Sequence, residues 1–288
     1  MNEHHKHNNA NPTHTHAEEG PGKTFETSGK QPEELNIPNE RSYYMKFSIS
    51  KSRIYPNQEA ALSFVPAKKG KEKEPVSLEV QHGKKMHLII VSEDLSYFNH
   101  IHPDVDEPGA FTANTFLPLP SKYTLFAEYK PVGSDHAVDR FEMLVEGDAP
   151  EPGVYSKEEL ANHSGRYSFS LELGHEQIIA GAANHIEGIV KKDGKQIDVN
   201  TLEDYLGAKA HIVIISAEDK EFLHVHPMVK DNKLSIHTDF KNPGIYRGWI
   251  QFQDKQQLHT IDFTLKAVAG QQHPVGHTLK KTEEVHSH

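Results

Sequence analysis

Histidines recur in the same pattern at two places in the chain. Residues 86–102 read MHLIIVSEDLSYFNHIH and residues 210–226 read AHIVIISAEDKEFLHVH, and a proline follows each segment. In both, one histidine precedes an apolar run, and two more histidines lie 13 and 15 residues after it. Neutral imidazole is a common protein ligand for zinc and copper, and three converging rings can coordinate either ion. The pattern therefore predicts two metal sites of the same design.

Each of these segments is expected to form a β-hairpin. The apolar run after the first histidine is short and rich in β-branched residues, which is typical of a buried strand. A hairpin loop with an even number of residues places His102 opposite His87. It also places His100 opposite Ile89, so the three imidazoles share one face of the hairpin. The predicted ligands are His87, His100 and His102 at the first site, and His211, His224 and His226 at the second.

A fourth histidine recurs further along each half of the chain. Pro120 and Pro243 occupy equivalent places, and His136 and His259 each lie 16 residues after them. We predict that His136 and His259 are additional ligands of the two sites, because imidazoles kept at equivalent places suggest a shared chemical role. Large rings usually dominate burial, so the repeated aromatic residues are assigned to the sandwich cores; they are Tyr123, Phe126, Tyr246 and Trp249.

The elements around these histidines predict an all-β fold. Several short strands with regular turn signals and no long helical period indicate two tandem antiparallel β-sandwich domains, of immunoglobulin-like or cupredoxin-like type. We place the first domain at residues 41–147 and the second at 166–268. The linker, 148–165, contains Ser156 ahead of two glutamates, which fits a helix N-cap, so a short helix is expected there.

The two ends of the chain differ in composition from the domains. Residues 1–40 and 269–288 are polar, contain several histidines and hold few apolar side chains. Such segments bury too little apolar surface to offset the entropy of ordering, so we predict disordered His-rich tails. They are expected either to bind metal loosely or to be solvated only.

Composition narrows the class of partner and of site. The formal net charge of −10 argues against nucleic acid as a partner. The chain has no cysteine, which excludes disulfides and thiolate metal sites. No apolar run is long enough to cross a bilayer, so no transmembrane segment is expected. Two locations stay open: the cytosol, or the outside of the cell for the mature form of an exported protein.

Both repeats resemble small bacterial extracytoplasmic β-sandwich domains of the YtkA-like and CopC-like type, which are associated with copper handling. The segments HLIIVSEDLSYFNHIHP and HIVIISAEDKEFLHVHP carry the likeness. The resemblance implies an extracellular or cell-surface protein whose leader is absent from this sequence. It also implies copper as the cofactor, and we expect zinc as the second choice.

The expected function is non-catalytic binding of a transition-metal ion, with a protein partner for metal transfer. Binding should weaken as protons compete for the imidazoles, near pH 6.5 for an unperturbed histidine. The alternative is a surface module that binds a protein or the cell wall, in which the His-x-His-Pro histidines only bond to loop carbonyls. An enzyme is not expected, because no nucleophile with its base, phosphate loop or cofactor motif appears.

Overall fold

The computed structural model describes residues 41–106 and 109–270. The predicted tails, 1–40 and 269–288, lie outside the described residues except for Ala269 and Gly270. The described chain consists of β-strands, turns and one 3-10 helix, η1 (Val199–Thr201). No helix in this described part is long and apolar enough to cross a membrane.

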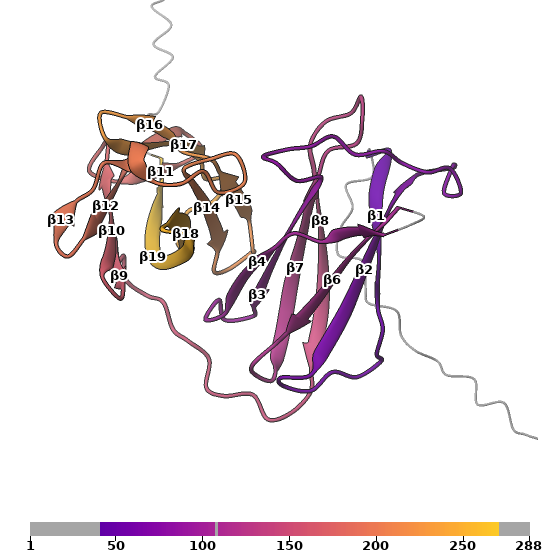
Figure 1. Cartoon of the computed structure of the whole chain (residues 1–288). Helices are drawn as coiled ribbons and strands as arrows, with labels where there is room; N and C mark the ends of the chain where they lie inside the picture. Colours follow the sequence, from indigo (N-terminus) through magenta and orange to yellow (C-terminus); the bar gives the residue numbers. More distant parts are fainter. Residues whose placement is uncertain (1–40, 107–108, 271–288) are drawn as a thin grey trace, which may run out of the picture. The chain divides into compact units, whose positions relative to one another are not determined.

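The first repeat forms a sandwich of two antiparallel sheets (Figure 1). Its strands are β1 (Tyr43–Ile49), β2 (Glu59–Lys68), β3 (Met86–Ser92), β4 (Phe98–Ile101), β5 (Asp104–Asp106), β6 (Ala110–Phe116), β7 (Ser121–Tyr129) and β8 (Ala137–Val145). One sheet has the order β1-β2-β6-β5 and the other β4-β3-β7-β8. Alternate residues of each strand point between the sheets, so Leu62 and Phe64 of β2 share a core with Leu88 and Ile90 of β3.

The second repeat has the same plan. Its strands are β9 (Ala161–Ser164), β10 (Tyr167–Leu173), β11 (Ile178–Ala180), β12 (Ala183–Lys192), β13 (Lys195–Gln196), β14 (Ala210–Ser216), β15 (Phe222–Val225), β16 (Met228–Lys230), β17 (Lys233–Asp239), β18 (Gly244–Asp254) and β19 (Gln257–Ala269). One sheet has the order β16-β17-β12-β10-β9, with β13 paired to β12. The other has the order β11-β19-β18-β14-β15, in which only β11 runs parallel to its neighbour. The prediction of two tandem immunoglobulin-like sandwiches is confirmed.

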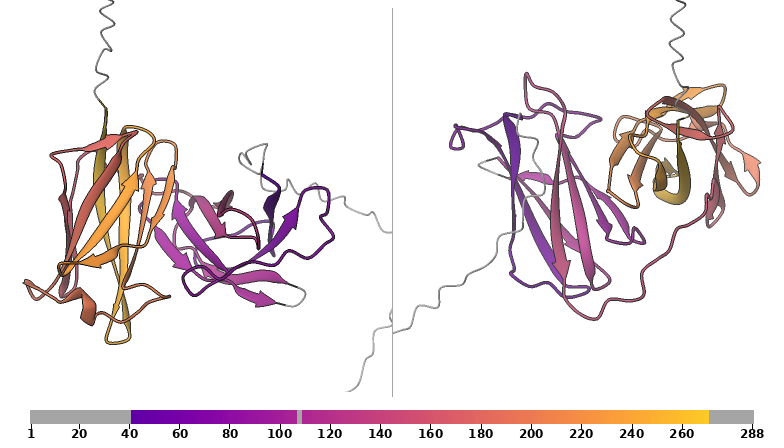
Figure 2. Two further views of the ribbon diagram at one scale, coloured as in Figure 1. Left: turned by 90° about the horizontal axis from the view of Figure 1, so that it is seen from above. Right: turned by 180° about the vertical axis from the view of Figure 1, so that it is seen from behind.

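The short helix expected in the linker 148–165 is not formed. The connection from β8 is a loop without a helix (Figure 2), Glu159 bridges to Thr264, and β9 then pairs with β10. Only about one helical turn would fit between Ser156 and β9, and the nucleation of so short a helix is unfavourable. Pairing with a sheet edge satisfies the same backbone groups, so the second sandwich begins at Ala161 rather than at residue 166.

The central strands β3 and β14 are buried on both faces. Every residue of both strands is buried, although only one face of each points into its own sandwich. The opposite faces, with Ile89 and Val91 on β3 and Val213 and Ile215 on β14, form a third apolar cluster with three other buried side chains. We call this cluster the junction core: Ile89, Val91, Leu95, Phe126, Val213, Ile215 and Trp249.

The junction core corrects the assignment of two aromatic residues. Tyr123 and Tyr246 lie in the sandwich cores as predicted. Phe126 and Trp249 follow them by three residues and therefore point to the opposite face of the sheet. There the rings stack across the repeats, Phe126 on Phe222 and Trp249 on Phe98, with centroids 4.6 Å apart in both pairs. Both repeats belong to one compact unit of the chain.

Candidate metal centre

The first triad, His87, His100 and His102, converges as the hairpin register predicts. β3 pairs with β4 so that Ile89 faces His100. The Nε2 of His100 lies 3.2 Å from the Nδ1 of His87 and 3.1 Å from the Nε2 of His102. Each ring offers one nitrogen, and the three nitrogens lie within 4.8 Å of one another, so this group could hold a metal ion.

The second triad, His211, His224 and His226, repeats this arrangement on β14 and β15. Val213 faces His224, as Ile89 faces His100 in the first repeat. The Nδ1 of His211 lies 3.4 Å from the Nε2 of His224 and 2.9 Å from the Nε2 of His226. In the described part of the chain, these two triads are the groups of three or more ligands that could hold an ion.

A tight turn fixes the first imidazole of each triad. The Nε2 of His87 bonds to the carbonyl oxygen of Gln81 at 3.0 Å, and that of His211 to the carbonyl oxygen of Tyr205 at 2.8 Å. A carbonyl only accepts, so Nε2 donates and the Nδ1 lone pair faces the triad. Both turns contain a glycine with positive φ, four residues before the histidine, which lets the chain reverse: Gly83 and Gly207.

The middle imidazole of each triad is fixed by a side chain from the other repeat. The Nδ1 of His100 lies 2.9 Å from the Oε1 of Gln251, and the Nδ1 of His224 bonds to a carboxylate oxygen of Glu128. The Nε2 of Gln251 donates to Thr260, which turns its oxygen toward His100. Both histidines therefore donate through Nδ1 and present the Nε2 lone pair to their own triad.

These tautomers leave two acceptor nitrogens facing each other in each triad. The two lone-pair nitrogens lie 3.2 Å apart in the first triad and 3.4 Å apart in the second, so they repel each other, and a cation bound to both removes this repulsion. Zinc–nitrogen bonds of about 2.0–2.1 Å at tetrahedral angles separate two ligand nitrogens by about 3.3–3.4 Å. The spacing of this nitrogen pair and the donor type of both triads therefore fit a small transition-metal ion.

Burial favours the neutral form of several of these imidazoles. The side chains of His87, His100 and His211 are no more than 5% exposed. Burial lowers the pKa of His102 to about 3 and that of His211 to about 4, from an ordinary value of 6.5. Burial and the neighbouring imidazoles lower the pKa of His100 well below the ordinary value. Neutral rings are the form that binds metal, so competition from protons shifts below the pH 6.5 expected for free histidine.

His136 is close to the metal centre but outside both triads. Its Nε2 lies 2.8 Å from Glu128, whose other oxygen bonds to His224. Burial opposes ionisation of Glu128, yet the hydrogen bonds from His136 and His224 outweigh it and hold the pKa of this carboxyl below its usual range. His136 thus contacts a ligand's partner, not the predicted ion position.

His259 lies away from the second triad. It pairs with Phe252 on β18, and its ring packs on Tyr167 with centroids 4.0 Å apart. Phe252 belongs to the sandwich core, whereas the triad lies on the opposite face of that sheet. β19 is also two strands from β14, about 9–10 Å away. The structure therefore does not bring His259 to the site predicted for it.

Sequence reasoning missed the partners of the imidazoles. Glu128 and Gln251 each lie five residues after Tyr123 and Tyr246, which occupy equivalent places in the two repeats. Glu128 pairs with His87 and Gln251 with His211 on neighbouring strands, so both partners lie on the triad faces. Gly83 and Gly207 lie four residues before the first histidine in both repeats. This repeated spacing was the sequence signal from which the turns with the bonding carbonyls could have been predicted.

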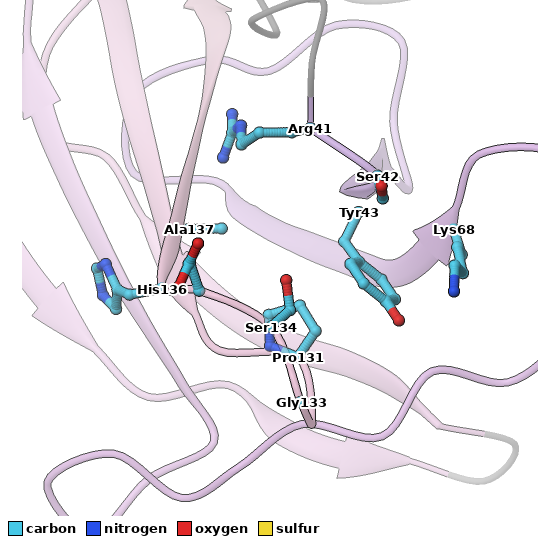
Figure 3. A pocket seen from close by; sticks show the side chains of 10 residues that line it. Arg41, Ser42, Tyr43, Lys68, Pro131, Gly133, Ser134, His136 and Ala137 are labelled. Carbon is cyan, nitrogen blue, oxygen red and sulfur yellow. The ribbon is translucent and has the colours of Figure 1, made fainter.

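Two hollows lie near these residues. One of about 180 Å³ adjoins the first triad at His87 and the second at His224 and His226, and its other lining residues are Gln81, His82, Glu128, Tyr129 and His136. His82 stacks on His226 in this region, with centroids 3.4 Å apart. Figure 3 shows another hollow, of about 430 Å³, with Arg41, Tyr43, Lys68 and Ser134 around it and His136 on its lining. Only the first hollow reaches a triad.

The fold and the site define a tandem immunoglobulin-like sandwich protein with a trihistidine group in each repeat. The chain belongs to the family described as Domain of unknown function (DUF8832), which matches residues 41–147 and again residues 161–269. None of the curated proteins matches the chain. No copper-handling family matches it either, so the likeness to YtkA-like and CopC-like domains stays a prediction.

Solved structures similar to this chain include three of different kinds. A two-domain fibronectin type III segment from chicken tenascin is 11% identical, with a TM-score of 0.22, and the match covers 77% of this chain and 97% of that segment. MtrC from Shewanella baltica OS185 is 8% identical, with a TM-score of 0.24 and coverage of 78% and 68%. Escherichia coli alpha-2-macroglobulin activated by porcine elastase is 11% identical, with a TM-score of 0.26 and coverage of 78% and 22%.

Proposed function

We propose that the protein binds two transition-metal ions without catalysis, one at each triad. The observation that carries the proposal is the pair of facing acceptor nitrogens in each triad. Hydrogen bonds to Gln81 and Gln251 fix them in the first triad, and bonds to Tyr205 and Glu128 fix them in the second. Such outer partners orient imidazoles that bind metal.

Copper is the first choice of ion and zinc the second. The triads offer only imidazole nitrogens, which suit both ions, and affinity for divalent ions at nitrogen sites peaks at copper. The lack of any cysteine removes thiolate competition within the chain. We place the protein outside the cytoplasm, at the cell surface or secreted, where a second protein would deliver or remove the ion.

Burial of the triads supports a holding role rather than turnover. The side chain of His224 is 1% exposed, and His87 and His100 are similarly covered. An ion at these nitrogens would lie beside the junction core, and the hollow that reaches the triads, of about 180 Å³, would leave room for only a small molecule beside it. This arrangement favours retention of the ion over repeated reaction at it.

The test is titration of Cu(II), and separately Zn(II), into the full chain and into a His102→Ala/His226→Ala variant. The unchanged protein should show about two submicromolar sites, and the variant should lose both because each triad lacks one ligand. A His163→Ala/His175→Ala variant removes two exposed histidines outside the triads and should keep both sites. Equal binding by all three proteins would reduce the triads to structural residues and favour the surface interaction module.

A further inference from the structure

The two triads have the same ligands but different outer partners. Glu128 and Gln251 occupy equivalent places, each paired in register with the first histidine of its own repeat. Each side chain reaches across the junction core to the middle histidine of the other triad. The second triad is therefore backed by a carboxylate and the first by a neutral amide.

A carboxylate and an amide act differently on a ligating imidazole. A carboxylate that accepts the outer N–H makes the ring nitrogen more basic and adds negative charge near the ion. An amide oxygen orients the ring but adds no net charge. Glu128 is also held by His136, while the corresponding His259 faces the sandwich core and Gln251 bonds instead to Thr260.

We propose that the two sites are unequal, and that the second triad holds a divalent ion more tightly than the first because Glu128 supports it. This inference rests on the proposed function and adds an order of filling to it. Outer partners of this kind change metal affinity by about 10- to 100-fold. At low metal supply the second site fills first, and the first site exchanges more readily.

Single-site proteins make the two affinities separately measurable. His102→Ala in the full chain leaves the second triad intact, and His226→Ala leaves the first. The zinc affinity of each protein is measured by competition with a chelator. The chelator is chosen to bind zinc more tightly than any weak site in the tails, so that only the triads compete with it. The His102→Ala protein should bind zinc about 10- to 100-fold more tightly than the His226→Ala protein.

Exchanging the outer partners then tests the cause. Glu128→Gln in the His102→Ala protein should weaken zinc binding by about 10- to 100-fold, and in the His226→Ala protein should leave it nearly unchanged. Gln251→Glu in the His226→Ala protein should tighten binding by a similar factor, a gain that mere structural damage would not produce. Glu142→Gln removes a carboxylate of the same sheet that binds Lys122, and should change neither affinity.

The outcomes separate this inference from the proposed function. Equal affinities of the two single-site proteins, or no effect of Glu128→Gln and Gln251→Glu, overturn the inequality while two histidine sites remain. Zinc binding that survives unchanged in a protein lacking both His102 and His226 overturns the proposed function and the inference together. Thermal unfolding of each variant shows whether a lost site reflects a lost fold. If the variants that lose affinity prove unfolded, the gain of zinc affinity expected for Gln251→Glu becomes the test of the inference.

Discussion

The two repeats have the same metal ligands but differ at one position on the strand next to the first histidine, where one has a glutamate and the other a glutamine. Both triads come from a hairpin of the same register, with a turn carbonyl on the first histidine and a cross-repeat partner on the second. The partner is Glu128 in one case and Gln251 in the other. Strand register therefore sets which atoms converge, whereas neighbouring side chains set the charge that an ion would meet.

The largest effect is expected from the junction core, on which both triads depend. Trp249→Ala removes a ring that is 4% exposed and stacked on Phe98, and should lower the free energy of unfolding by about 3–5 kcal/mol. Phe126→Ala should act similarly, since the two rings occupy equivalent places. Urea unfolding measures both, with the 57%-exposed Phe116→Ala as a control expected to change stability by less than about 0.5 kcal/mol. A harmless Trp249→Ala would mean that the repeats do not rely on each other.

Metal should stabilise the fold in two separable steps. An ion that binds only the folded chain adds about 2.7 kcal/mol per site at a free concentration 100-fold above its Kd. Zinc should therefore raise the unfolding temperature of the full chain more than that of His102→Ala or His226→Ala, and EDTA should reverse the rise. The same increment in all three proteins would place the stabilising ion elsewhere.

Acid should weaken the metal-free protein in a defined window. The pKa of His211 is lowered by burial from 6.5 to about 4, so the unfolded chain takes up this proton first as the pH falls. Stability is then full above pH 6.5 and decreases between pH 6.5 and 4. Urea unfolding at several pH values after EDTA treatment measures the loss. His211→Gln should flatten the profile, and an unchanged slope would show that His211 is not held neutral.

The smallest effect concerns the fourth histidines. His136→Ala removes one hydrogen bond to Glu128, worth about 0.5–1 kcal/mol, and should weaken zinc at the second triad about two- to fivefold. His259→Ala should leave both affinities unchanged, because that ring packs in the other face of its sheet. Chelator competition on the full chain decides, and a large effect of His259→Ala would restore it as a ligand.

The fold and the convergence of the ligands could be predicted because both follow from strand periodicity. The shared spacing of His87 and His100 with His211 and His224 fixes two hairpins of equal register. The prediction of a linker helix was wrong because the cap at Ser156 is only a local signal. The edge of a sheet competes for the hydrogen bonds of the same backbone.

The cross-repeat contacts could not be predicted because periodicity within one sandwich says nothing of what covers its outer face. A hint was present in Leu88–Val91, where every residue is apolar instead of every second one. Such a run indicates a strand covered on both faces. It did not reveal which surface covers it, and so Glu128 and Gln251 were missed.

The reciprocal bonds of His100 to Gln251 and His224 to Glu128 have the form of a twofold-symmetric dimer interface joined into one chain. In a dimer of identical subunits, a contact from one copy to its partner is repeated in reverse with the same residue type. Any mutation there would change both sites at once. When both copies belong to one chain, the two equivalent positions can carry different residues. Glu128 and Gln251 are such a pair.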